Sequence, residues 1–68
     1  MKYDYSQSLA SIDKLYHEVN TLIAGLEYDS VTMDESEKAD RFILELIISR
    51  LKYSADYLHS AKAIANRN

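Results

Sequence analysis

The sequence predicts an all-α protein built as an antiparallel two-helix hairpin. Three observations support this fold class. The chain contains no proline and one glycine, so little in it interrupts a helix. Hydrophobic residues recur at helical spacing in two long segments, and one short break separates these segments. Because a short connection makes consecutive helices pack antiparallel, we expect a single helical-hairpin domain over residues 1–68.

The first segment predicts a helix over about residues 4–28. Its hydrophobic residues are spaced alternately by four and three positions, which places them on one stripe of a helix. Leu15 and Leu22 widen this stripe on one flank. Gly25 lies at an outward position and costs about 1 kcal/mol of helix stability relative to alanine, so we expect either fraying or close approach of a neighbouring backbone there. The stripe consists of Tyr5, Leu9, Ile12, Tyr16, Val19, Ile23 and Leu26.

Residues 29–33 break the pattern, because short polar side chains compete with helical hydrogen bonds and β-branched residues disfavour the helix. A second helix is expected to start directly after this break with a capping box, in which two residues three positions apart satisfy each other's backbone. Thr32 with Glu35 fits this motif, and so does Asp34 with Glu37.

The second helix is predicted over about residues 33–65. A bend about residue 31 would place Val19 of the first helix beside Ile43 of the second. Since the second helix is then the longer of the two, its last turns, His59 to Ala65, would overhang the hairpin.

The second helix carries more hydrophobic residues than one partner helix covers. Ile43, Tyr57 and Ile64 flank its predicted core stripe, and Phe42, Leu46, Ile48 and Tyr53 are expected to lie outside it. Small proteins rarely expose a hydrophobic patch of that size without a partner, so we expect the hairpin to pair with a second copy as a homodimeric four-helix bundle. The predicted core stripe consists of Leu44, Ile47, Leu51, Ser54, Leu58, Ala61 and Ala65.

This surplus suggests a small non-enzymatic protein–protein interaction module, namely an adaptor, a regulator or an inhibitor, which uses an apolar face of the second helix. The expected partners are a second copy of the chain and another protein. Tyrosine is enriched at protein interfaces, and six tyrosines are present. The expected protein-interface residues are Phe42, Leu46, Ile48, Tyr53, Tyr57, Ala61 and Ile64.

The charge distribution leaves an alternative function open. The net charge of −3 argues against general nucleic-acid binding. However, residues 1–49 carry ten acidic and four basic side chains, whereas residues 50–68 carry one acidic and four basic side chains. A dimeric bundle could therefore regulate nucleic acid through its basic C-terminal half. The alternative contacts are Arg50, Lys52, Lys62 and Arg67. Arg50 is expected to pair either with Asp13 of the same hairpin or with an acidic residue of a second copy.

The sequence shows no catalytic motif and no phosphate-binding loop, so we expect no enzyme activity and no cofactor. There is no cysteine, and Asp56 and His59, three residues apart, indicate a surface pair and no metal site. No hydrophobic run approaches the ~20 residues that span a membrane. The first residues, Met1 to Gln7, have no signal-peptide pattern, so we expect a cytoplasmic protein without membrane contact.

Overall fold

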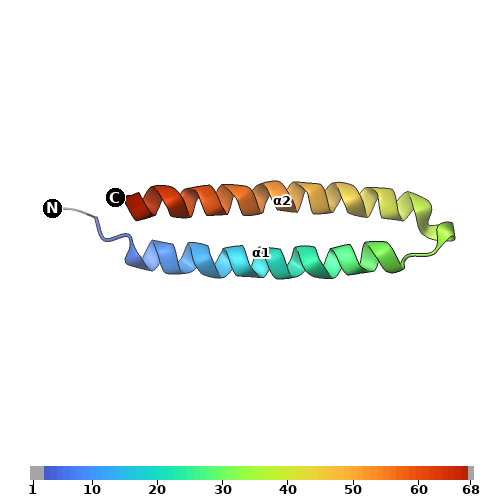
Figure 1. Cartoon of the computed structure of the whole chain (residues 1–68), viewed down its shortest axis with the longest axis horizontal. Coiled ribbons are helices and arrows are strands. Elements are labelled where there is room, and N and C mark those ends of the chain that lie inside the picture. The colour runs from blue at the N-terminus through green and yellow to red at the C-terminus, as the bar shows by residue number, and fades with distance from the viewer. Residues whose placement is uncertain (1–2, 68) are drawn as a thin grey trace.

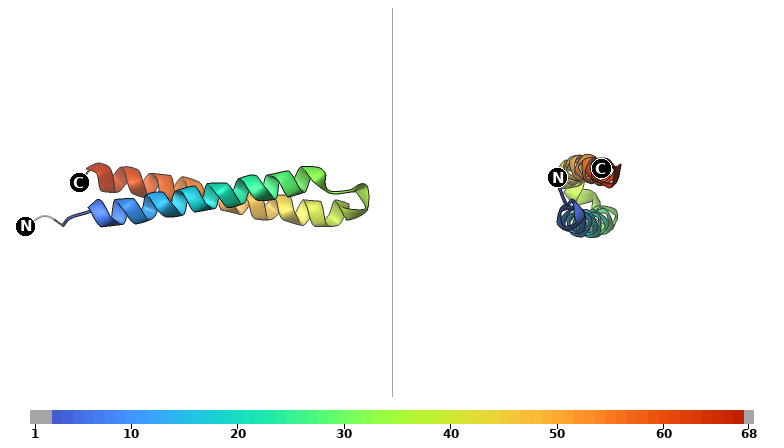
Figure 2. Two further views of the ribbon diagram at one scale, coloured as in Figure 1. Left: turned by 90° about the horizontal axis from the view of Figure 1, so that it is seen from below. Right: turned by 90° about the vertical axis from the view of Figure 1, so that its left-hand side faces the viewer.

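Two long helices joined by a tight turn make up the protein, as a computed structural model describes it for residues 3–67 (Figure 1). Helix α1 comprises Ser6–Thr32, the short 3-10 helix η1 Glu35–Glu37, and helix α2 Lys38–Arg67. The helices run antiparallel and lie side by side along their length (Figure 1), and a perpendicular view shows that they cross slightly (Figure 2). The Cα trace measures 60 × 14 × 11 Å along its principal axes. The predicted all-helical hairpin is therefore confirmed.

The stripe predicted for the first helix faces α2. Ile23 is only 5% exposed, and the other six members of the stripe are half-buried. The stripe also continues past residue 28, where the sequence predicted the helix to end, because Ser30 is buried and Met33 half-buried at the next two positions of the same spacing. Helix α1 therefore ends later than predicted, at Thr32.

The turn shows which residue caps the following helix. The hydroxyl of Thr32 donates to the backbone carbonyls of Tyr28 and Asp29, at 3.1 Å each, so Thr32 completes the last turn of α1. Asp34 and Glu37 form the capping box, in which the Asp34 N–H donates to Glu37 Oε2 at 3.1 Å. Of the two predicted caps, the structure contains the second.

Arg41 ties the beginning of α2 to the end of α1. Its Nη2 donates to the backbone carbonyl of Met33, directly after α1. The guanidinium therefore lies at the C-terminal end of α1, where the helix dipole favours a positive charge. Its Nε is buried and has no hydrogen-bond partner within the part of the chain that the structure describes.

The helices pair in a different register from the predicted one. Lys62 Nζ lies 2.6 Å from Asp13 Oδ1, and the rings of Tyr16 and His59 lie 5.8 Å apart. The turn falls at residues 33–37, later than the predicted bend, which moves every pairing along α2. The end of α2 consequently lies beside the start of α1 (Figure 1), and the predicted overhang of His59 to Ala65 is wrong.

The core of α2 also differs from the prediction. Ile48 and Ala55 are 7% and 6% exposed and form the buried centre with Ile23, whereas Ile47 and Ser54 are exposed. Both choices keep the helical spacing, but the observed one places the methyl group of Ala55 in the seam instead of the more polar Ser54, which donates its hydroxyl hydrogen bond to the Arg50 carbonyl on the exposed side. The half-buried residues shared by the predicted and observed stripes are Leu44, Leu51, Leu58 and Ala65.

Candidate interaction surface

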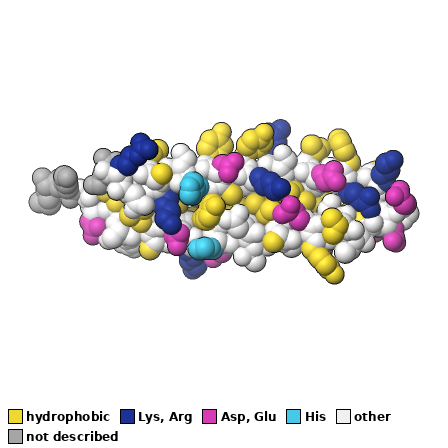
Figure 3. Space-filling model, in the orientation of Figure 1, with side chains coloured by type: hydrophobic (Ala, Val, Ile, Leu, Met, Phe, Trp, Pro, Cys, Tyr) yellow, Lys and Arg dark blue, Asp and Glu magenta, His cyan; other side chains and the backbone are white. Residues whose placement is uncertain are grey.

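One flank of the seam between the helices is polar. Lys52 Nζ lies 3.3 Å from Glu27 Oε2, and Lys62 pairs with Asp13 further along the same flank. Figure 3 shows one side of the molecule, on which charged side chains of both signs lie near the seam and hydrophobic side chains project from the edge of α2 that points away from α1. The predicted pairing of Arg50 with Asp13 is wrong, because the shifted register brings Lys62 to that carboxylate.

The Lys62 ammonium changes the acidity of its partner. Its hydrogen bond and its positive charge lower the pKa of Asp13 below the ordinary value of 3.8, and nearby His17, 3.7 Å away, acts weakly in the same direction. The carboxylate therefore stays ionised at neutral pH. This pair joins the two helices near the open end of the hairpin.

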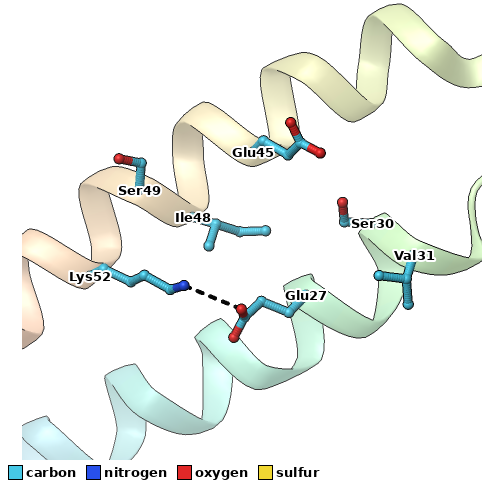
Figure 4. A pocket seen from close by; sticks show the side chains of 7 residues that line it. All are labelled: Glu27, Ser30, Val31, Glu45, Ile48, Ser49 and Lys52. Atoms are coloured by element: carbon cyan, nitrogen blue, oxygen red, sulfur yellow. Dashed lines mark ion pairs between the residues drawn. The ribbon is translucent and has the colours of Figure 1, made fainter.

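An open groove of about 370 Å³ interrupts the polar flank near the turn (Figure 4). The Lys52 ammonium reaches across it to the Glu27 carboxylate, and Ile48 points from α2 towards α1 at its floor. The groove holds two carboxylates, but one of them is already paired with lysine. Its lining residues are Glu27, Ser30, Val31, Glu45, Ile48, Ser49 and Lys52.

The opposite flank of the seam is apolar. Leu15 and Leu22 of α1, and Ile47 of α2, each directly precede a residue of the core stripe. In an antiparallel helix pair these positions lie on one side of the seam, and the positions of Glu27 and Lys52 lie on the other. All three apolar side chains are about half exposed. Both helices therefore contribute to an apolar flank.

Most of the predicted interface residues lie on the exposed surface of α2. Together with Ile43 and Ile47 they form what we call the apolar face of α2. Ile48 does not belong to it, because it is buried against α1, and its predicted exposure is wrong. The apolar face consists of Phe42, Ile43, Leu46, Ile47, Tyr53, Tyr57, Ala61 and Ile64.

Ile43 and Ile47 are the members of the apolar face that the sequence prediction assigned elsewhere. It placed Ile47 in the core stripe and Ile43 beside it, whereas Ile47 is 47% exposed and Ile43 is 55% exposed. Two adjacent isoleucines at residues 47 and 48 fit a stripe equally well by spacing alone. The polar character of Ser54, one heptad after Ile47, is the signal that favours Ile48 for the core.

The four basic residues proposed for nucleic acid do not come together as one patch. Lys52 and Lys62 are engaged in ion pairs with α1, on the polar flank. Arg50 and Arg67 are exposed, but the length of α2 between them is about 25 Å at ~1.5 Å per residue. The pairing of both lysines within the hairpin weakens the case for a phosphate-binding surface.

The hairpin exposes more surface than a compact protein of its size. Its accessible area is 5558 Å², compared with ~4,400 Å² expected for a folded chain of 7.8 kDa. The excess of roughly 1,200 Å² exceeds the ~800 Å² that each partner contributes to a standard protein interface. The rod shape and the narrow core explain the excess, and the apolar face of α2 supplies hydrophobic area for a partner.

Within residues 3–67, no three histidine, aspartate or glutamate side chains are grouped so that they could hold a metal ion. No helix of the described chain is both long enough and apolar enough to cross a membrane. Compared with known proteins, the chain matches no family model, no curated protein and no solved structure.

Proposed function

We propose that the protein is a small non-enzymatic interaction module that binds other proteins through the apolar face of α2. One observation carries this proposal. In residues 3–67, three apolar side chains are buried, whereas twelve large hydrophobic side chains are exposed. Seven of these twelve belong to α2. A patch of this kind on a small protein supports a role in binding.

A second copy of the chain is the simplest partner for this face. Pairing two hairpins would produce a four-helix bundle and bury the hydrophobic side chains that one hairpin leaves exposed. The narrow core supports this step, because a chain of this size without disulfides or a metal gains stability from oligomerisation. An adaptor, regulator or inhibitor role follows if the remaining surface binds a different protein.

Photo-crosslinking from two matched tyrosine positions tests the proposal. Tyr53 on the apolar face and Tyr28 on α1 are both well exposed, so each position accepts p-benzoylphenylalanine without disturbing the core. In extract of the source cell, we expect discrete protein adducts from position 53 and few or none from position 28. Equal labelling from both positions, or none from either, would contradict the proposal.

A substitution checks that the adducts depend on the apolar face. Leu46→Glu should remove the adducts formed from position 53, because it places a charge within the hydrophobic contact. Thr21→Glu, on the exposed side of α1, is the matched control and should leave them unchanged. Circular dichroism of both variants verifies that the helices are retained.

A further inference from the structure

Four side chains on α2 form a stripe that is symmetric about its own centre. Asp40, Ile43, Ile47 and Arg50 are separated by three, four and three residues, so they lie on one side of the helix. All four are exposed. From either end, the stripe presents a charge, two isoleucines and then the opposite charge. Such a pattern is complementary to a second copy of itself that runs in the opposite direction.

We infer that a second copy of the chain covers this stripe, with the two α2 helices antiparallel across a two-fold axis. Ile43 of each copy then packs against Ile47 of the other, and Asp40 of each copy pairs with Arg50 of the other. An isologous contact of this kind forms every pairing twice. The inference rests on the proposed function, because it names the partner and the register for the same apolar face.

The structure shows no oppositely charged partner for Asp40 or Arg50 among residues 3–67. They are also too far apart to pair with each other, since ten residues of helix separate them by about 15 Å. A second copy in antiparallel orientation supplies the opposite charge to both.

Other registers of the antiparallel pair fit less well. A shift of the copies by one heptad would bring Arg50 against Ile47 and Asp40 against Tyr57. A shift by two heptads would bring Asp40 against Ile64. In each of these contacts a charge would lose water without gaining an opposite charge, which is unfavourable. Of these three registers, only the one that places Ile43 against Ile47 also pairs both charges.

Charge reversal tests this register in the full-length chain. Asp40→Arg places two arginines opposite each other at both ends of the contact, and Arg50→Asp places two aspartates there. We expect each variant alone to dimerise with a Kd raised about tenfold in sedimentation equilibrium at low salt. The double variant restores the pairs in reversed order, so its Kd should return to within about threefold of the wild-type value.

Mixing the two single variants gives the sharpest result. Asp40→Arg and Arg50→Asp, each weak alone, should form a heterodimer of about wild-type affinity, because every contact then joins opposite charges. Asp56→Arg mixed with Arg67→Asp is the matched control: the same charges change on α2, away from the stripe, and no such recovery is expected.

The outcomes separate this inference from the proposed function. Dimerisation that single reversals leave unchanged, or that mixing does not recover, would overturn the register. A chain that stays a 7.8 kDa monomer at hundreds of micromolar would overturn the second copy as the occupant. The proposed function would still hold in these cases if specific adducts form at position 53 and not at position 28.

Discussion

Two adjacent isoleucines on α2 offer a direct test of the packing, because Ile48 is 7% exposed and Ile47 is 47% exposed. Replacing each by alanine removes the same atoms from the same helix. In protein cores such a change costs about 2–5 kcal/mol. Since the buried centre is only one layer between two helices, partial collapse is easy, and we expect about 2–3 kcal/mol for Ile48→Ala.

For Ile47→Ala the expected loss is smaller. About half of its side chain is already in water, so at most half of the ~1.5–3 kcal/mol for burying an isoleucine is lost. The higher helix propensity of alanine offsets a few tenths of a kcal/mol. We therefore expect a net loss of about 1 kcal/mol or less, against a total stability of roughly 3–10 kcal/mol for a chain of this length.

Urea denaturation followed by far-UV circular dichroism measures both losses. With an m-value of about 1 kcal/mol/M for a small protein, the midpoint should fall by roughly 2–3 M for Ile48→Ala and by under about 1 M for Ile47→Ala. The two variants should be compared at the lowest workable protein concentration, because a contact of Ile47 with a second copy then contributes least to stability. An equal loss for both variants, or a larger loss for Ile47→Ala, would refute the observed core assignment.

Three further substitutions test the turn, the helix interior and the ion pair. Gly25→Ala should stabilise the hairpin by about 0.5–1 kcal/mol, because an added Cβ meets no atom within 4 Å and alanine favours the helix; thermal melts measure this. Asp34→Ala should destabilise it by about 1 kcal/mol through loss of the capping box, whereas Thr32→Ala should have a smaller effect in the same melts. Lys62→Met should raise the pKa of Asp13 towards 3.8, since the lysine is the main cause of its lowering; NMR titration of the carboxyl group follows the change.

The ion pair between Asp13 and Lys62 also sets the direction in which the stability of the hairpin changes with pH. Because the pKa of Asp13 is lowered in the folded state, its contribution to stability is fully present above the ordinary value of 3.8 and is lost as the pH falls through the lowered value. Asp4 is the internal control, since the Ser6 backbone N–H lowers its pKa and Lys62→Met should leave it unchanged. A pKa of Asp13 that does not move in this variant would contradict the observed pairing.

The sequence by itself determined the two helices and the face that α1 presents to α2. Helices depend on contacts three and four residues apart, which are visible in a single chain. The stripe from Tyr5 to Leu26 is therefore recognisable without any knowledge of its partner. The excess of hydrophobic residues on the second helix was equally visible, and the structure places most of them on the surface.

Only the tertiary structure decided how the two helices meet. Spacing allowed either Ile47 or Ile48 to face α1, and the choice depended on what lies across the seam and one heptad further along. The register depended on where the turn closes, which the capping box at Asp34 sets. The pairing of Asp13 with Lys62 followed from that register. These features depend on contacts between residues far apart in the chain, and helical periodicity carries no information about such contacts.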